Sequence, residues 1–124
     1  MDRQLLEDIF VTALEGGSNY WYYINNENQH KIRKAVPKSE DPYFATALLT
    51  AILDHNQKIE VQDAENEEEV LGVLSYENIQ ERLKKLANDK VHSWALTAHE
   101  DENGDAESAD IVFQYLVIGD VWFG

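Results

Sequence analysis

The sequence predicts an α+β fold that is mostly helical: a single domain over residues 1–124 with four to five helices and one β-hairpin. Two observations lead to this prediction. Apolar residues recur in several segments with the period of an amphipathic helix. Between these segments, residues 58–62 alternate polar and apolar side chains and residues 70–74 are apolar and partly β-branched, which together indicate a hairpin with an acidic loop. The length of 124 residues is enough for one buried core.

The first helix is indicated by an apolar stripe, and two glycines mark its expected end. The stripe consists of Leu5, Leu6, Ile9, Phe10, Ala13 and Leu14. Glycine adopts the left-handed conformation that closes a helix without a Cβ clash, so we expect positive φ at Gly16 or Gly17. The alternative is a backbone that must come close to a ligand or to another chain.

Four consecutive aromatic residues follow, Tyr20, Trp21, Tyr22 and Tyr23. Consecutive side chains cannot all face the same way on a strand or a helix. Some of them must therefore be exposed or line a cleft, and their polar tips suit a boundary between core and water. The alternative is that alternate members of the run are ordinary core residues.

The middle of the chain holds a basic patch and the second long helix. The patch consists of Lys31, Arg33, Lys34 and Lys38. It indicates a solvated loop or short helix, with an anion site as the alternative. Asp41 and Pro42 have the residue types of an N-cap and a first helical residue, so we expect a helix from Pro42 to about His55, ended by Asn56. Its apolar stripe, which includes Leu48, is expected to pack against the first helix.

Two further helices are predicted after the hairpin. Ser75 is the expected N-cap of the first, whose apolar positions are Ile79, Leu83, Leu86 and Ala87. Asn88 and Asp89 indicate a break. A helical spacing then continues through Val91, Trp94, Ala95 and Ala98.

Residues 111–118 are apolar on all sides, so periodicity alone does not distinguish a helix from a buried strand. Asp105 or Ser108 as the N-cap and Gly119 at the C′ position favour a helix.

The last residues, 120–124, are expected to form an extended tail. An exposed tail with Trp122 and Phe123 would leave an apolar patch on an acidic surface. We therefore expect the tail to dock near residues 20–23, with a second copy of the chain as the alternative partner for its aromatic rings.

The net charge of −14, from 24 acidic and 10 basic side chains, makes contact with nucleic-acid phosphates unfavourable. The chain has no cysteine, which excludes disulfides and thiolate metal sites and fits a reducing compartment. No segment approaches the length of a membrane span. We therefore expect a cytoplasmic protein that binds neither nucleic acid nor membranes.

Half of the acidic residues fall into two groups, within residues 60–69 and 100–110. Such groups are usually solvated loops, and the alternatives are a surface that imitates a phosphate backbone or one that attracts a basic partner. Counted from Asp101, a calcium loop would need glycine and glutamate where Ala106 and Val112 stand, and the four histidines are scattered. We predict no catalytic residues, no metal site and no cofactor.

Two motifs resemble those of a known family. Residues 12–21 follow the pattern T-A-L-E-G-G-x-x-Y-W, and the chain ends with D-A-x-x-A-D followed by Gln114, Gly119 and Gly124. The combination is similar to that of a family of small, functionally uncharacterised proteins from bacteriophages and bacterial mobile elements. No established activity comes with this resemblance. It implies a phage or prophage setting, in which small acidic proteins often bind and block a host component.

Two functions remain open. The first is a non-enzymatic protein that engages a host protein through an acidic and aromatic surface. The alternative is a small-ligand-binding protein or enzyme with a pocket near Glu15, Tyr20 and Trp21. A concave site lined by these aromatic rings and a carboxylate would favour the alternative. The candidate residues for binding a partner or ligand are Glu15, Gly16, Gly17, Tyr20, Trp21, Asp110 and Gln114.

Overall fold

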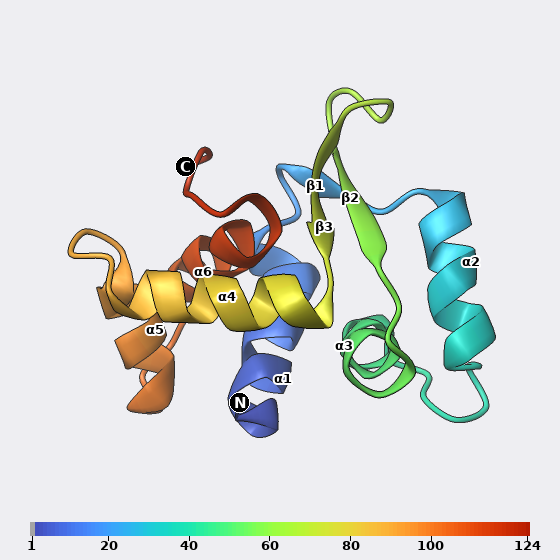
Figure 1. The fold of residues 1–124 in the computed structure, drawn as a ribbon, viewed down its shortest axis with the longest axis horizontal. Coiled ribbons are helices and arrows are strands. Elements are labelled where there is room, and N and C mark those ends of the chain that lie inside the picture. Colours follow the sequence, from blue (N-terminus) through green and yellow to red (C-terminus); the bar gives the residue numbers. More distant parts are fainter. Residues whose placement is uncertain (1) are drawn as a thin grey trace.

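The computed structural model describes residues 2–124 (Figure 1). Its α-helices are α1 (Arg3–Thr12), α2 (Asn26–Ala35), α3 (Phe44–His55), α4 (Tyr76–Ala87), α5 (Ser93–Glu100) and α6 (Ala106–Ile118), and its strands are β1 (Tyr22–Tyr23), β2 (Ile59–Asp63) and β3 (Val70–Leu74). A single π-helical turn, η1 (Ala13–Gly17), continues α1. The mostly helical α+β prediction is confirmed. In the described residues, six α-helices stand where four to five were expected.

The predicted hairpin is confirmed, and a short third strand extends it into an antiparallel sheet of order β1-β2-β3. β2 pairs with β3, and the register of this pairing shifts between Val61 and Gln62. β1 was not predicted, because two adjacent aromatic residues give no alternating pattern. Its pairing sets Tyr22 opposite Asp63 and Tyr23 opposite Gln62, so the aromatic run lies against the hairpin.

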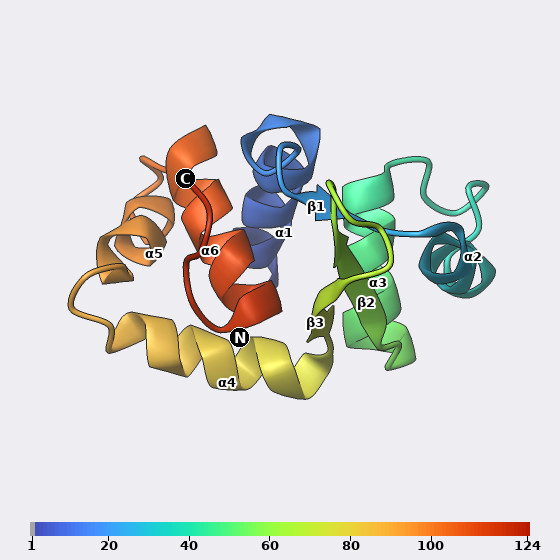
Figure 2. The ribbon, with the colours of Figure 1, turned by 90° about the horizontal axis from the view of Figure 1, so that it is seen from above.

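The helices lie on both sides of the hairpin. Seen from above, α1, α5 and α6 lie to one side and α2 and α3 to the other (Figure 2), and α4 passes in front of α1 and α6 in the view of Figure 1. The predicted packing of α1 against α3 is confirmed, and Leu48 is fully buried. Phe10 and Phe113 join α1 to α6 edge to face, with ring centroids 5.5 Å apart. Among residues 2–124, no helix has the length and apolar character needed to cross a membrane.

The second long helix begins at Phe44, two residues later than predicted. The backbone carbonyls of Asp41 and Pro42 accept hydrogen bonds from the Arg33 guanidinium at 2.7 and 3.3 Å. These bonds hold the pair outside the helix, and the Asp41 side chain accepts from the Tyr43 N–H instead of capping a turn that starts at Pro42. The predicted end is confirmed, since Asn56 has a φ of 51°.

The apolar segment 111–118 lies within the helix α6, as predicted. Asp105 and Ser108 form a capping box: the Ser108 N–H donates to the Asp105 side chain, and the Asp105 N–H donates to the Ser108 hydroxyl. Gly119 closes the helix with a φ of 85°, which only glycine adopts at little cost. Ser75 caps α4 as predicted. Val91 lies before α5 and is exposed, so its apolar spacing does not mark a buried helix face.

The end of the first helix contradicts the prediction. Neither Gly16 nor Gly17 has positive φ, because α1 does not stop in a left-handed residue but widens into η1. The turn closes where the Ser18 N–H donates to the Ala13 carbonyl at 2.8 Å. A Cβ on Gly17 would lie 2.5 Å from the backbone oxygen of Ala106, so glycine is needed there for close approach to α6.

Candidate functional site

Both sequence motifs meet at one buried carboxylate, Asp110 on α6. Its Oδ1 accepts hydrogen bonds from Ser18 Oγ at 2.8 Å and from Trp21 Nε1 at 2.7 Å. Its Oδ2 accepts from the Tyr20 hydroxyl at 2.5 Å and from Gln114 Nε2 at 3.2 Å. Asp110 is only 8% exposed, and it is the one buried carboxylate in the described residues. We call these five residues the Asp110 junction.

Local structure brings the junction together. Asp110 and Gln114 are four residues apart on α6 and therefore lie on the same face of that helix. The donors Ser18, Tyr20 and Trp21 come from the tight segment between η1 and β1, where the Trp21 N–H donates to the Ser18 carbonyl at 3.2 Å. The junction thus joins the start of the chain to its last helix.

Gln114 connects the junction to the C-terminal tail. Its side chain is fully buried. Oε1 accepts from the backbone N–H groups of Trp122 and Phe123, both at 2.9 Å, and Nε2 donates to the Phe123 carbonyl at 3.1 Å. One amide side chain therefore fixes two consecutive residues of an extended segment.

The predicted docking of the tail near the aromatic run is confirmed through Phe123. Its ring stacks on Trp21 with centroids 5.4 Å apart and an angle of 10° between the planes. Trp21 is 1% exposed, so this stack is part of the core. Trp122, the other aromatic residue of the tail, is 61% exposed. The tail therefore buries one ring and presents the other.

A cleft of about 610 Å³ lies between the tail and the first half of α6. Four of the predicted site residues line it: Gly16, Gly17, Tyr20 and Asp110. Trp21 and Gln114 lie beneath it and are buried. Glu15 does not line the cleft; it is exposed on η1, and its side chain makes no hydrogen bond within the described residues.

The protein itself fills the hydrogen-bonding capacity of the Asp110 carboxylate. Both oxygens of Asp110 accept hydrogen bonds from the chain's own side chains, so neither is placed to take a proton from a ligand. Burial, together with the hydrogen bond to Asp110, raises the pKa of the Tyr20 hydroxyl well above its ordinary range, which keeps it protonated as a donor. Within residues 2–124, no three histidine or acidic side chains come together as a metal site.

Sequence reasoning missed one member of the junction, Ser18. It is fully buried and donates to Asp110, although it fills a variable position of the first motif. The sequence indicated it only indirectly: a hydroxyl two residues before a pair of aromatic residues with polar tips suggests that all three share an acceptor elsewhere in the chain. Nothing near Ser18 in sequence identifies that acceptor as Asp110.

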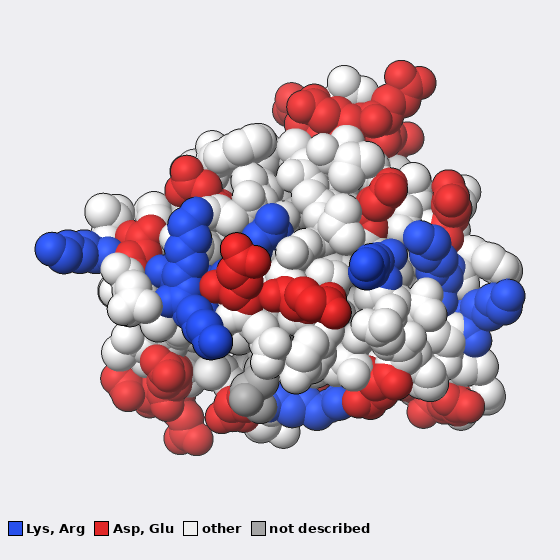
Figure 3. Space-filling view, in the orientation of Figure 1, with Lys and Arg blue, Asp and Glu red and all other residues white. Residues whose placement is uncertain are grey.

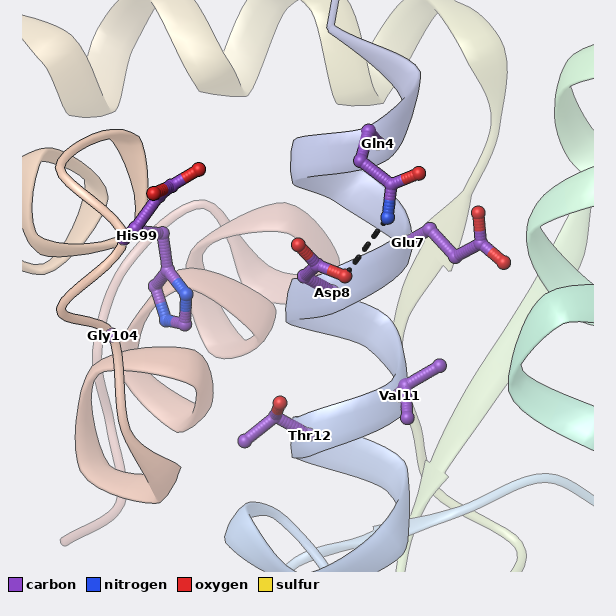
Figure 4. A pocket seen from close by; sticks show the side chains of 8 residues that line it. Gln4, Glu7, Asp8, Val11, Thr12, His99 and Gly104 are labelled. Carbon is purple, nitrogen blue, oxygen red and sulfur yellow. Dashed lines mark hydrogen bonds between the residues drawn. The ribbon is translucent and has the colours of Figure 1, made fainter.

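A second cleft, of about 470 Å³, lies between α1 and the segment that joins α5 to α6 (Figure 4). Glu7 and Asp8 line it from α1, and Glu102 lines it from the other side. His99 faces α1 across it, with Nε2 3.0 Å from the Ser108 hydroxyl. Burial lowers the pKa of His99 despite the nearby carboxylates of Asp105 and Asp8. The cleft adds three carboxylates to the acidic surface.

The β2–β3 connection forms a separate acidic feature. We call residues 64–69 the acidic loop; all six are exposed, and four of them are glutamates: Glu65, Glu67, Glu68 and Glu69. In Figure 3 these carboxylates form a group at the top of the molecule, where the hairpin projects in Figure 1. The only ion pair among residues 2–124 joins Arg3 to Asp54, so none of the loop carboxylates is paired with a described cation.

Comparisons of the chain with protein-family models, with curated proteins and with solved structures find no match. The resemblance of its motifs to a phage and mobile-element family therefore stays an expectation.

Proposed function

We propose that this chain is a non-enzymatic acidic binding protein that engages a basic surface of a host protein. The setting is the phage or mobile-element one that its motifs resemble. The contact surface consists of the acidic loop and the neighbouring aromatic segment, in which Tyr20 is 51% exposed.

The observation that carries the proposal is the unpaired charge of the acidic loop. Its four glutamates are exposed at the tip of a projecting hairpin, and no cation of the described residues pairs with them. Like charges held together repel each other, so a partner with lysine or arginine side chains would relieve this repulsion on binding. Complementary charge also speeds association with such a partner.

The loop is ordered before it meets any partner. The Ala64 N–H donates to the Trp21 carbonyl at 2.8 Å, which ties the loop to the aromatic segment. Within the loop, the Glu65 N–H donates to the Asp63 carboxylate at 2.8 Å, and the Asp63 N–H donates to the Glu69 carbonyl at 3.0 Å. A surface that is fixed in advance loses little conformational entropy on binding.

The Asp110 junction supports a role other than catalysis. Its carboxylate is buried, and its acceptor positions are taken by the four donors of the junction. We therefore assign the junction the task of holding the aromatic segment beneath the acidic loop.

Small-ligand binding is the second candidate, and one observation favours it. The cleft of about 610 Å³ has a size typical of ligand pockets, and Tyr20 and Asp110 line it. Trp21, which this hypothesis placed in the pocket, is buried beneath it, and Glu15 lies outside it.

Affinity capture from a bacterial lysate tests the main proposal. The immobilised chain is expected to retain a basic host protein, and a variant with Glu65, Glu67, Glu68 and Glu69 changed to Gln is expected to lose it. Retention should also fall at high salt, which screens exposed charges.

A matched variant separates the loop from the total charge. Changing Glu77, Glu81, Glu100 and Glu102 to Gln removes the same number of exposed carboxylates from α4, α5 and the segment after it. This variant should retain the partner. Equal loss in both variants, or equal retention, would contradict a specific role of the acidic loop.

A further inference from the structure

A third cleft carries the opposite charge. It has a volume of about 440 Å³, lies between α2 and the end of α3, and is lined by His30, Lys31, Lys34, Ala35, His55 and Gln57. Five of these six side chains carry a nitrogen that can donate to an anion. The cleft shares no lining residue with the acidic loop or the Asp110 junction, so the inference stands apart from the proposed function.

The spacing on α2 gathers three of these nitrogen-bearing side chains on one face. His30 and Lys34 are four residues apart, and Lys31 and Lys34 are three apart, so all three are neighbours on the helix surface. The like charges of Lys31 and Lys34 at this spacing destabilise a helix in the absence of a counter-charge. The negative end of the helix dipole accounts for Lys34 in the last turn of α2 and for His55 in the last turn of α3. It does not account for Lys31, which lies before the last turn.

The chain does not neutralise this cluster itself, although it has 24 acidic residues. No carboxylate of residues 2–124 lies within ion-pair distance of Lys31 or Lys34. Asp54 precedes His55 in sequence, but both of its oxygens are held by the Arg3 guanidinium, at 2.7 and 2.8 Å. Glu27 lies four residues before Lys31 on α2 but makes no ion pair with it, and Asp54 is engaged with α1.

The far wall of the cleft is formed by the end of α3. The Gln57 N–H donates to the Ala51 carbonyl, and Gln57 Nε2 donates to the His55 carbonyl, so two carbonyls at the end of α3 already have donors. The Lys31 side chain extends from α2 towards the chain after α3, where its ammonium lies 3.5 Å from the Lys58 carbonyl. A negatively charged group between α2 and α3 would meet ammonium and imidazole groups from both sides.

We propose that this cleft binds the phosphoryl group of a small anionic ligand. Lysine ammonium groups bind phosphate as mobile point charges, and imidazole N–H groups add directional donors. The cleft volume falls within the range of small-molecule sites. In an acidic protein, an anion binds most favourably at a local group of cations that has no ion-pair partner within the chain.

Titration of the ¹⁵N-labelled chain with sodium pyrophosphate tests this inference by NMR, at constant ionic strength because screening alters every exposed charge. Saturable shifts are expected at residues 30–35 and 55–58. Changing Lys31 and Lys34 together to Gln should weaken binding at least about tenfold, and changing both to Arg should restore it. Circular dichroism shows whether each variant keeps its fold.

The matched control changes Lys84 and Lys90 to Gln, which removes two exposed lysines elsewhere. It should bind pyrophosphate as the unmodified chain does. Shifts that do not saturate, or an equal loss in this control, would overturn the site. Citrate binding as tightly as pyrophosphate would overturn its assignment to phosphoryl groups.

Discussion

Asp110 and the glutamates of the acidic loop carry the same functional group in opposite surroundings. The Asp110 carboxylate is buried and accepts hydrogen bonds from four side chains, three from the first part of the sequence and one from the last helix. The carboxylates of the acidic loop are exposed and have no described cation as partner. The Asp110 carboxylate therefore stabilises the fold, and the carboxylates of the acidic loop are available to bind another molecule.

The difference shows that residue type and position in the sequence do not separate a structural acid from a binding acid. Asp110 belongs to the acidic group that ends at residue 110, and the acidic residue before it, Glu107, is exposed. What distinguishes it is the number of donors that face it. Substitutions at the two sites should therefore have effects of very different size.

The largest effect is expected at Asp110. Asp110→Ala leaves the buried donors of Ser18 and Trp21 without an acceptor, so the free energy of unfolding should fall by about 3 kcal/mol or more. Glu67→Ala in the acidic loop is the control and should stay within about 0.5 kcal/mol. Chemical denaturation measures both. A loss at Asp110 as small as the one at Glu67 would remove the contrast between the two regions.

A smaller effect is expected in the tail, where two neighbouring aromatic residues provide the comparison. Phe123→Ala removes the ring stacked on Trp21 and should cost about 1–3 kcal/mol, which lowers the thermal midpoint by several degrees. It should also change the emission of Trp21. Trp122→Ala removes an exposed ring and should leave the midpoint nearly unchanged. Equal midpoints for the two variants would show that the tail does not dock in solution.

The smallest effect concerns the Tyr20 hydroxyl and depends on pH. Tyr20→Phe should cost about 1 kcal/mol at neutral pH, because the lost hydrogen bond is to a carboxylate but the ring is half exposed. The pKa of Tyr20 is raised above its ordinary value of 10, mainly by burial, so its contribution is complete below pH 10 and is lost as the pH rises further. The stability difference between the two proteins should therefore shrink above pH 10.

Another tyrosine provides a check on this measurement. Burial and a hydrogen bond to Asp89 raise the pKa of Tyr115 to about 12, and its contribution is lost over the same alkaline range in both proteins. The difference between the unmodified chain and Tyr20→Phe isolates Tyr20. A difference that stays constant above pH 10 would mean that the hydroxyl keeps its proton equally well in the unfolded chain.

Local signals predicted most of the fold. Periodicity and caps identified every α-helix except α2, whose segment the sequence predicts only as a solvated loop or short helix. Residue types at Ser75, Asn56 and Gly119 marked helix boundaries correctly. The start of α3 was predicted too early because the Arg33 guanidinium, eight residues before Asp41, holds the carbonyls of Asp41 and Pro42. A long-range bond of this kind leaves no pattern around the residues that accept it.

The sequence predicted most of the residues of the candidate site but not how they are arranged in space. Tyr20, Trp21, Asp110 and Gln114 do come together, whereas Glu15 stays outside. Ser18 was missed because its acceptor lies 92 residues away in the chain. The glycine pair was assigned the wrong conformation, since the closeness of Gly17 to Ala106 follows from tertiary packing and not from the local sequence.

The π-helical turn η1 gives the segment before the junction room for one extra residue. Its closing bond spans five residues, from Ser18 to Ala13, where an α-helix spans four. A chain lacking Gly16 should therefore close the same turn in α-helical geometry and keep Tyr20 and Trp21 on the side of Asp110. A residue inserted into α1 itself, where no wider turn takes it up, would instead rotate the rest of the helix by about 100° around its axis. Gly16 should also tolerate replacement, because its Cβ position meets nothing within 4 Å.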